Sequence, residues 1–73
     1  MDETDSQAAF VRLVGGRERA NRLQRIWDNS YPSGTEYDRI FWPGRYRTKE
    51  QVFRLKAKRE GFKDKEISSF LDL

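Results

Sequence analysis

The chain has 73 residues, enough for one small domain with a modest core and too few for a deep enzyme cleft. It contains no cysteine and no histidine, so disulfides, zinc fingers, thiolate nucleophiles and imidazole acid–base catalysis are all excluded. Charged residues make up 37% of the chain, which carries a net charge of +3, and its two Trp, three Tyr and five Phe are many for this length. We expect a protein that is not an enzyme, holds no cofactor or metal, and builds its core from aromatic side chains.

The first six residues, 1–6, hold three acids and no base, and they have too little apolar content to offset the entropy lost on ordering. The sequence predicts a mobile acidic tail over residues 1–6 and a single helical domain over residues 7–73. This N-terminus also lacks the basic and then apolar character of a signal peptide. No apolar run approaches the roughly 20 residues that span a bilayer. Both features favour a cytoplasmic location and no membrane partner.

Two helices are predicted in the first part of the chain. Residues 7–14 are apolar enough for two helical turns, with Ser6 available as the cap, and Gly15 and Gly16 favour a corner after them. Residues 17–29 place apolar side chains at helical spacing, with arginines on the other faces. Asn29, Ser30 and Pro32 indicate its end.

Residues 48–73 read as two further helices joined by a tight corner. Thr48 can cap the first of them, and Gln51 can reach back to the Thr48 amide to complete a capping box. Gly61 offers the left-handed conformation that commonly ends a helix, and Phe62 can fold back onto the last turn. Asp64 is the predicted cap of the last helix. The fold class expected is therefore all-α, a small bundle of three to four short helices with a long aromatic-rich loop.

The predicted core consists of the apolar residues that repeat at helical spacing on these charged segments. Replacing such a residue by Ala should cost roughly 2 to 5 kcal/mol. The residues are Leu23, Trp27, Phe53, Leu55, Ile67, Phe70 and Leu71.

Residues 61–73, GFKDKEISSFLDL, resemble the opening of many bacterial helix-turn-helix domains, in which a glycine corner and a short helix precede the recognition helix. The resemblance covers about a third of the chain and does not include the recognition helix that would enter the major groove. No base-contacting residue is therefore carried over, and we expect no reading of DNA sequence.

The aromatic-rich loop, residues 31–47, has no clear periodicity, although a helical turn over residues 37–42 is favoured. Aromatic rings alternate with guanidinium groups in this loop, a combination enriched at interaction hot spots. The predicted partner-binding residues are Tyr37, Trp42, Arg45, Tyr46 and Arg47. The alternative is that Phe41 and Trp42 fill the core while the arginines are only solvated.

A small, basic, helical chain without Cys or His resembles phage-encoded proteins that bind RNA polymerase as transcription inhibitors and antiterminators. The resemblance rests on this general character and on the partial helix-turn-helix of residues 61–73. It implies a monomer in the bacterial host cytoplasm that contacts a polymerase subunit and alters initiation and termination.

The second hypothesis is direct nucleic-acid binding by a basic surface, as in small excisionase-like or repressor-like phage proteins. Residues 44–65 hold nine bases against three acids, a charge balance suited to phosphate contacts. The residues assigned to this alternative are Lys56, Lys58, Arg59, Lys63 and Lys65.

Overall fold

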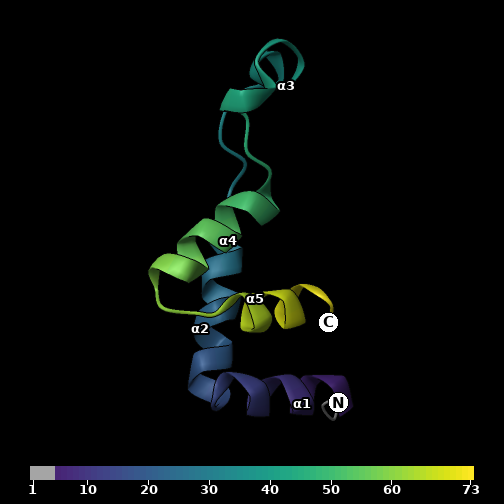
Figure 1. The fold of residues 1–73 in the computed structure, drawn as a ribbon, viewed down its shortest axis with the longest axis vertical. Helices are drawn as coiled ribbons and strands as arrows, with labels where there is room; N and C mark the ends of the chain where they lie inside the picture. The colour runs from purple at the N-terminus through teal and green to yellow at the C-terminus, as the bar shows by residue number, and fades with distance from the viewer. Residues whose placement is uncertain (1–4) are drawn as a thin grey trace.

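The computed structural model describes residues 5–73, and this part of the chain is an assembly of short helices (Figure 1). The all-α fold class is confirmed. The helices are α1 (Asp5–Val14), α2 (Arg17–Asp28), α3 (Glu36–Phe41), the 3₁₀ helix η1 (Pro43–Arg45), α4 (Lys49–Arg59) and α5 (Asp64–Leu71). The described residues thus contain five α-helices where three to four were predicted, because the aromatic-rich loop folds around α3.

The first helix starts earlier than the sequence suggested. Asp5 and Ser6 already belong to α1, so Ser6 lies inside the helix and does not cap it. The predicted mobile tail therefore overlaps the helix by these two residues. The rest of that tail, residues 1–4, lies outside the described part of the chain.

Two glycine corners end α1 and α4 in the same way. Gly15 and Gly61 both have positive φ, at 91° and 97°. At the second corner the Gly61 amide donates to the Lys58 carbonyl and the Phe62 amide to the Ala57 carbonyl, both at 3.0 Å. This pair of bonds is the Schellman motif, and it turns Phe62 back into the core, where the side chain is only 3% exposed.

Helices α1, α2, α4 and α5 form the body of the molecule, with α2 along the long axis, α4 running obliquely to it, and α1 and α5 lying across it (Figure 1). Each of these helices packs against two of the others, and their apolar faces enclose one core. The Phe53 ring lies 5.3 Å from the Trp27 ring and 5.1 Å from the Phe70 ring, so aromatic contacts join three helices. The fully or nearly fully buried apolar residues are Phe10, Val14, Leu23, Phe53, Ala57, Phe62 and Ile67.

The predicted core is correct for six residues and wrong for one. Leu23, Phe53 and Ile67 are completely buried, while Trp27, Phe70 and Leu71 are partly buried against them. Leu55 is 51% exposed. Phe53 and Ala57 lie one turn apart on α4 and share its buried face, whereas Leu55, two residues from each, points away from that face.

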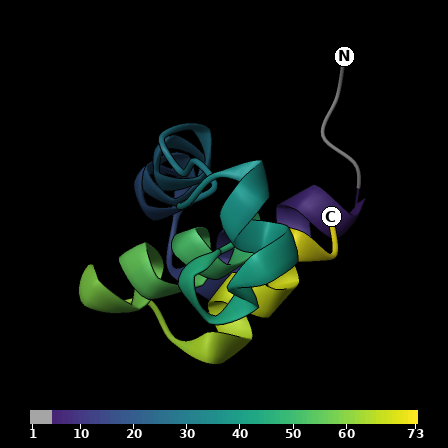
Figure 2. The same cartoon turned by 90° about the horizontal axis from the view of Figure 1, so that it is seen from above.

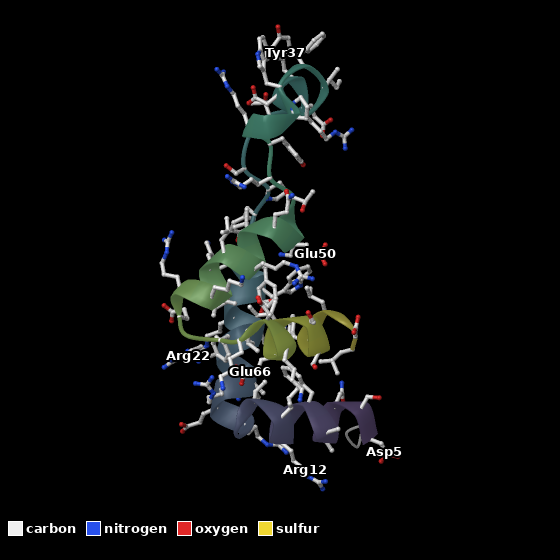
Figure 3. All side chains as sticks on the ribbon, viewed as in Figure 1. Asp5, Arg12, Arg22, Tyr37, Glu50 and Glu66 are labelled. Carbon is white, nitrogen blue, oxygen red and sulfur yellow. The ribbon has the colours of Figure 1, made fainter. Side chains whose placement is uncertain are left out.

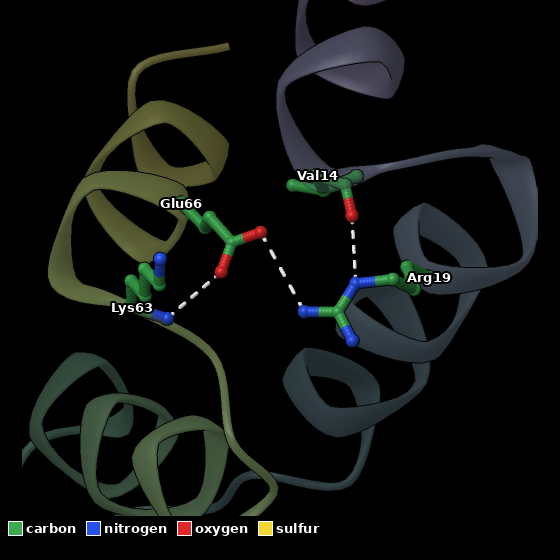
Figure 4. A network of polar contacts seen from close by, with 4 residues as sticks. All are labelled: Val14, Arg19, Lys63 and Glu66. Carbon is green, nitrogen blue, oxygen red and sulfur yellow. Dashed lines mark hydrogen bonds and ion pairs between the residues drawn. The ribbon is translucent and has the colours of Figure 1, made fainter.

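A polar network joins three elements at the start of α5 (Figure 4). A Glu66 carboxylate oxygen accepts a hydrogen bond from the Lys63 amide at 2.8 Å, which caps the helix. The other oxygen lies 3.5 Å from the Arg19 guanidinium, whose Nε donates to the Val14 carbonyl at 2.6 Å. The prediction of Asp64 as the cap is wrong, because Lys63 occupies the cap position and Asp64 instead pairs with Lys58 at 3.0 Å.

Candidate interaction site

Residues 31–47 form an excursion that leaves the body between α2 and α4 and returns to it, hereafter the hairpin. Its base is closed by an isolated antiparallel bridge, in which the Ser33 and Arg47 amides each donate to the other's carbonyl at 2.9 Å. Gly34 follows the bridge with φ at 104°, and a Cβ at this position would lie 3.3 Å from the Arg45 carbonyl oxygen. A side chain does not fit there without displacing backbone, so glycine allows the two arms of the hairpin to approach each other.

Lys49 attaches the base of the hairpin to the body. Its ammonium group donates to the Trp27 carbonyl at 2.7 Å and to the Ser30 carbonyl at 2.9 Å, and it lies 4.6 Å from the centre of the Trp27 ring. The last carbonyls of a helix lack partners within that helix. The first residue of α4 therefore caps the end of α2 and fixes where the hairpin leaves the body.

At the far end of the hairpin, α3 is started by its own side chains. The Thr35 hydroxyl accepts from the Asp38 amide at 3.1 Å, and Asp38 accepts from the Thr35 amide at 3.2 Å. This capping box stabilises a helix of only six residues that no other helix of the described chain packs against, apart from η1. The hairpin is thus held by local hydrogen bonds.

The apolar side chains of α3 face solvent at the end of the molecule farthest from α1 (Figures 1 and 3). The aromatic rings here pack against one another at tilted angles, with the centre of the Tyr37 ring 4.6 Å from that of Phe41 and 5.3 Å from that of Trp42. We call this cluster the aromatic tip, and it consists of Tyr37 (57% exposed), Ile40 (66%), Phe41 (60%) and Trp42 (45%).

Charged residues of both signs lie around the aromatic tip. The Arg45 guanidinium lies 5.6 Å from the Trp42 ring, a cation–π distance, and Arg39 pairs with Glu36 at 3.1 Å. Asp38 is a second acid on α3, and Arg47 is exposed at the base of the hairpin. The tip thus presents an apolar centre with a mixed charged edge, in which Arg45 is the arginine without an acidic partner among residues 5–73.

The structure places the predicted partner-binding residues in two groups. Tyr37, Trp42 and Arg45 lie together at the tip. Tyr46 and Arg47 lie lower: Tyr46 is half-buried against Gly34, and Arg47 belongs to the bridge with Ser33. The first group thus lies at the tip of the hairpin, and the second lies nearer its base.

The alternative that Phe41 and Trp42 fill the core is wrong, since Phe41 is 60% exposed and Trp42 45%, and their rings pack against Tyr37 and against each other. Ile40 was not assigned to the site from sequence. A sequence signal that could have identified Ile40 is the capping box of Thr35 and Asp38. It marks residues 36–41 as a short helix of its own, and none of its residues is buried.

The predicted nucleic-acid residues do not form one free surface. Lys56 donates to the Asn29 carbonyl at 2.9 Å, and Lys58 pairs with Asp64. Arg59 lies instead beside two arginines of α2, Arg22 and Arg25. Lys63 and Lys65 are exposed at the start of α5.

Comparison with known proteins identifies no matching family model, no matching curated sequence and no matching solved structure. Between residues 5 and 73, no helix is long and apolar enough to cross a membrane. Two surface features of the described residues are candidates for binding a partner: the aromatic tip, and the arginines Arg22, Arg25 and Arg59 that lie between α2 and α4.

Proposed function

We propose that this protein is a binding protein that inserts its aromatic tip into a recess on a larger protein partner. The observation that carries the proposal is the exposure of four large apolar side chains on a hairpin whose base is closed by the Ser33–Arg47 bridge and lies beside the bonds of Lys49 to the end of α2. Clusters of this kind are rare on monomeric surfaces and are typical of interaction sites.

The chemistry of the tip favours a protein partner. Trp, Tyr and Arg dominate hot spots because they bury a large area while losing few rotamers. The rings of Tyr37, Phe41 and Trp42 already pack against one another, so binding costs little side-chain entropy. Arg45, which lies beside the Trp42 ring without an acidic partner among residues 5–73, favours an acid at the edge of the partner's apolar recess.

The partner we propose is bacterial RNA polymerase, with the protein altering initiation and termination in the host cytoplasm. Support for this assignment comes from the resemblance of the sequence to small phage proteins that bind polymerase. The tip is compatible with it, since it offers an interaction surface and needs no catalytic residue. The mode of action is occupation of a subunit surface.

Binding to purified RNA polymerase with two variants tests both parts of the proposal. Phe41→Ala and Trp42→Ala should each weaken binding by about tenfold or more, as expected for hot-spot truncations worth over 1 kcal/mol. Leu55→Ala is the matched control, since Leu55 is equally exposed but lies on the body. Both tip variants should also lose any effect in a transcription assay.

Different outcomes would refute the proposed site and the proposed partner. Unchanged polymerase binding by both tip variants would refute the tip as the site. Absence of binding by the unaltered protein would refute polymerase as the partner.

A further inference from the structure

Four of the seven residues that line an open groove between α2 and α4 are cationic. Its residues come from two rows, one on each helix, and the volume of the groove is about 380 Å³. We call it the basic groove, and its lining residues are Arg22, Arg25, Ile26, Asn29, Lys56, Arg59 and Glu60.

The charge of this groove is not neutralised within the molecule. Four cations and one acid line it, a net charge of 4 − 1 = +3. Arg22, Arg25 and Arg59 form no ion pair with any acid among residues 5–73, whereas Arg19, Arg39, Arg54 and Lys58 each form one. Glu60 lines the groove without pairing to its neighbour Arg59. Three guanidinium groups are therefore left with their charge directed to solvent or to a ligand.

Local structure holds the two rows in place. Lys56 reaches across from α4 to the Asn29 carbonyl at the end of α2, so the two helices are joined at one end of the groove. Arg22 and Arg25 are three residues apart on α2, and Lys56 and Arg59 are three apart on α4, so each pair lies on one helix face. Arg22 and Arg25 also line an adjoining hollow on α2 with Asn21 and Glu18, so the cationic surface ends at Glu18 on that side.

We infer that the basic groove binds the phosphodiester backbone of a nucleic acid, without reading its bases. Guanidinium groups match phosphate oxygens in charge and in bidentate geometry. No aromatic side chain lines the groove, and Ile26 is its one apolar residue, so it lacks both the anchor of a protein hot spot and a platform for base stacking. A regularly spaced polyanion is the ligand that two rows of cations fit best, and phosphate contacts alone position a nucleic acid without specifying its sequence.

This site differs from the basic surface predicted from sequence, because two of its arginines come from α2 and because Lys58, Lys63 and Lys65 lie outside it. It does not depend on the proposed function of the tip. The hairpin contributes no residue to the groove, so the two surfaces can be tested separately.

The test measures binding of the whole protein to a fluorescent DNA duplex of about 20 base pairs, at about 50 and 200 mM salt. The groove variant is Arg22→Gln, Arg25→Gln and Arg59→Gln combined, and it leaves Lys56 intact because that residue caps α2. The matched control, Arg12→Gln, Lys63→Gln and Lys65→Gln combined, removes the same charge from other exposed positions. Circular dichroism and thermal unfolding establish that both variants stay folded.

Unaltered protein should bind with a Kd of about 1 to 100 μM that does not depend on base sequence, and its affinity should fall steeply as the salt concentration rises. The groove variant should bind about 100-fold more weakly at low salt, with the slope of log K against log salt smaller by about 2 to 3, because each lost phosphate contact removes nearly one unit. The control should keep its affinity within about threefold and keep the slope. Trp42→Ala should bind DNA like the unaltered protein.

Three results would overturn the inference. Equal losses in the groove variant and the control would show that total charge, and not the groove, is responsible. Undetectable binding by the unaltered protein at low salt would remove the site altogether. Binding of polyglutamate as tight as binding of the duplex would replace the phosphate ligand with an acidic peptide.

Discussion

At the scale of single residues, Lys49 does more than its place in the sequence suggests. It lies on a charged segment where a lysine is expected to be solvated, yet its ammonium group bonds two carbonyls at the end of α2 and lies over the Trp27 ring. Hydrogen bonds to a charged group contribute about 1.5 to 3 kcal/mol each when buried, and less where water competes. Lys49 is half-buried, so the lower part of this range applies.

Lys49→Met should destabilise the protein by about 1 to 2 kcal/mol, because Met keeps the aliphatic contact but leaves the Ser30 carbonyl without a donor, while the Trp27 carbonyl keeps only its bond from the Ser30 amide. Urea unfolding followed by circular dichroism measures the change. Lys65→Met is the control, since Lys65 is exposed on α5 and its side chain makes no hydrogen bond or ion pair within residues 5–73, and it should stay within about 0.5 kcal/mol of the unaltered protein. Equal effects of the two substitutions would contradict the capping role of Lys49.

The two apolar residues Phe53 and Leu55 give a second residue-scale prediction. Phe53→Ala should cost about 3 to 5 kcal/mol, since the ring is fully buried and touches Trp27 and Phe70. Leu55→Ala should change the free energy of unfolding by less than about 0.5 kcal/mol, because half of Leu55 is exposed. Denaturant midpoints of the two variants measure these changes in the free energy of unfolding. A large loss of stability in Leu55→Ala would show that Leu55 belongs to the core.

At the scale of elements, the hairpin depends on one close approach of its two arms. Gly34 combines a positive φ with a backbone contact that leaves no room for a Cβ. Gly44, at the turn of η1, has neither constraint, and a Cβ there would meet nothing within 4 Å. Substitution by Ala is therefore expected to disturb the hairpin at Gly34 but not at Gly44.

Gly34→Ala should open the bridge between Ser33 and Arg47 at a cost of about 1 to 3 kcal/mol, whereas Gly44→Ala should leave it closed. Amide hydrogen exchange of Ser33 and Arg47 reports the bridge directly and should accelerate only in Gly34→Ala. Because the core lies in the other helices, exchange in α2 and α4 should stay slow in both variants. Slow bridge exchange in Gly34→Ala would show that the backbone relaxes around the new methyl group.

At the scale of the whole molecule, the protein is elongated for its length. It measures 44 × 26 × 17 Å, and its radius of gyration is 14.2 Å, against the roughly 11 Å expected for a compact domain of this size. Figure 1 shows α3 and α1 at opposite ends of the long axis, and in Figure 2, seen from above, α3 lies in front of the body. The extra length is the hairpin, and its aromatic tip is the end of the molecule most accessible to a large partner.

Replacing residues 34–46 by a short glycine-containing turn of about three residues should therefore leave the body folded. The hairpin contributes no buried apolar residue to the core, so the melting temperature should fall by no more than about 5 °C. Binding to the protein partner should be lost, while binding of duplex DNA by the basic groove should persist. Thermal unfolding and the two binding assays provide the measurements, and unfolding of the shortened chain would show that the hairpin stabilises the body.

The sequence by itself determined the features that depend on neighbours along the chain. The capping box of Thr48 and Gln51 is present as predicted, with bonds of 3.2 and 2.8 Å, because both partners lie within one helical turn. The corner at Gly61 and the burial of Phe62 followed from the same kind of local rule, since a positive φ needs no information from elsewhere. The helical fold class follows from the periodicity of apolar residues for the same reason.

Only the tertiary structure decided which apolar face of a helix is buried and which charges are free. Helix α4 carries apolar side chains on more than one face, and its packing against α2 and α5 selected Phe53 and Ala57 over Leu55. The outward direction of Phe41 depends on where Lys49 fixes the base of the hairpin, through bonds that span 19 and 22 residues. The basic groove joins arginines more than thirty residues apart in the chain, Arg22 and Arg25 with Arg59. Such pairings depend on the packing of whole helices, a property that local propensity does not contain.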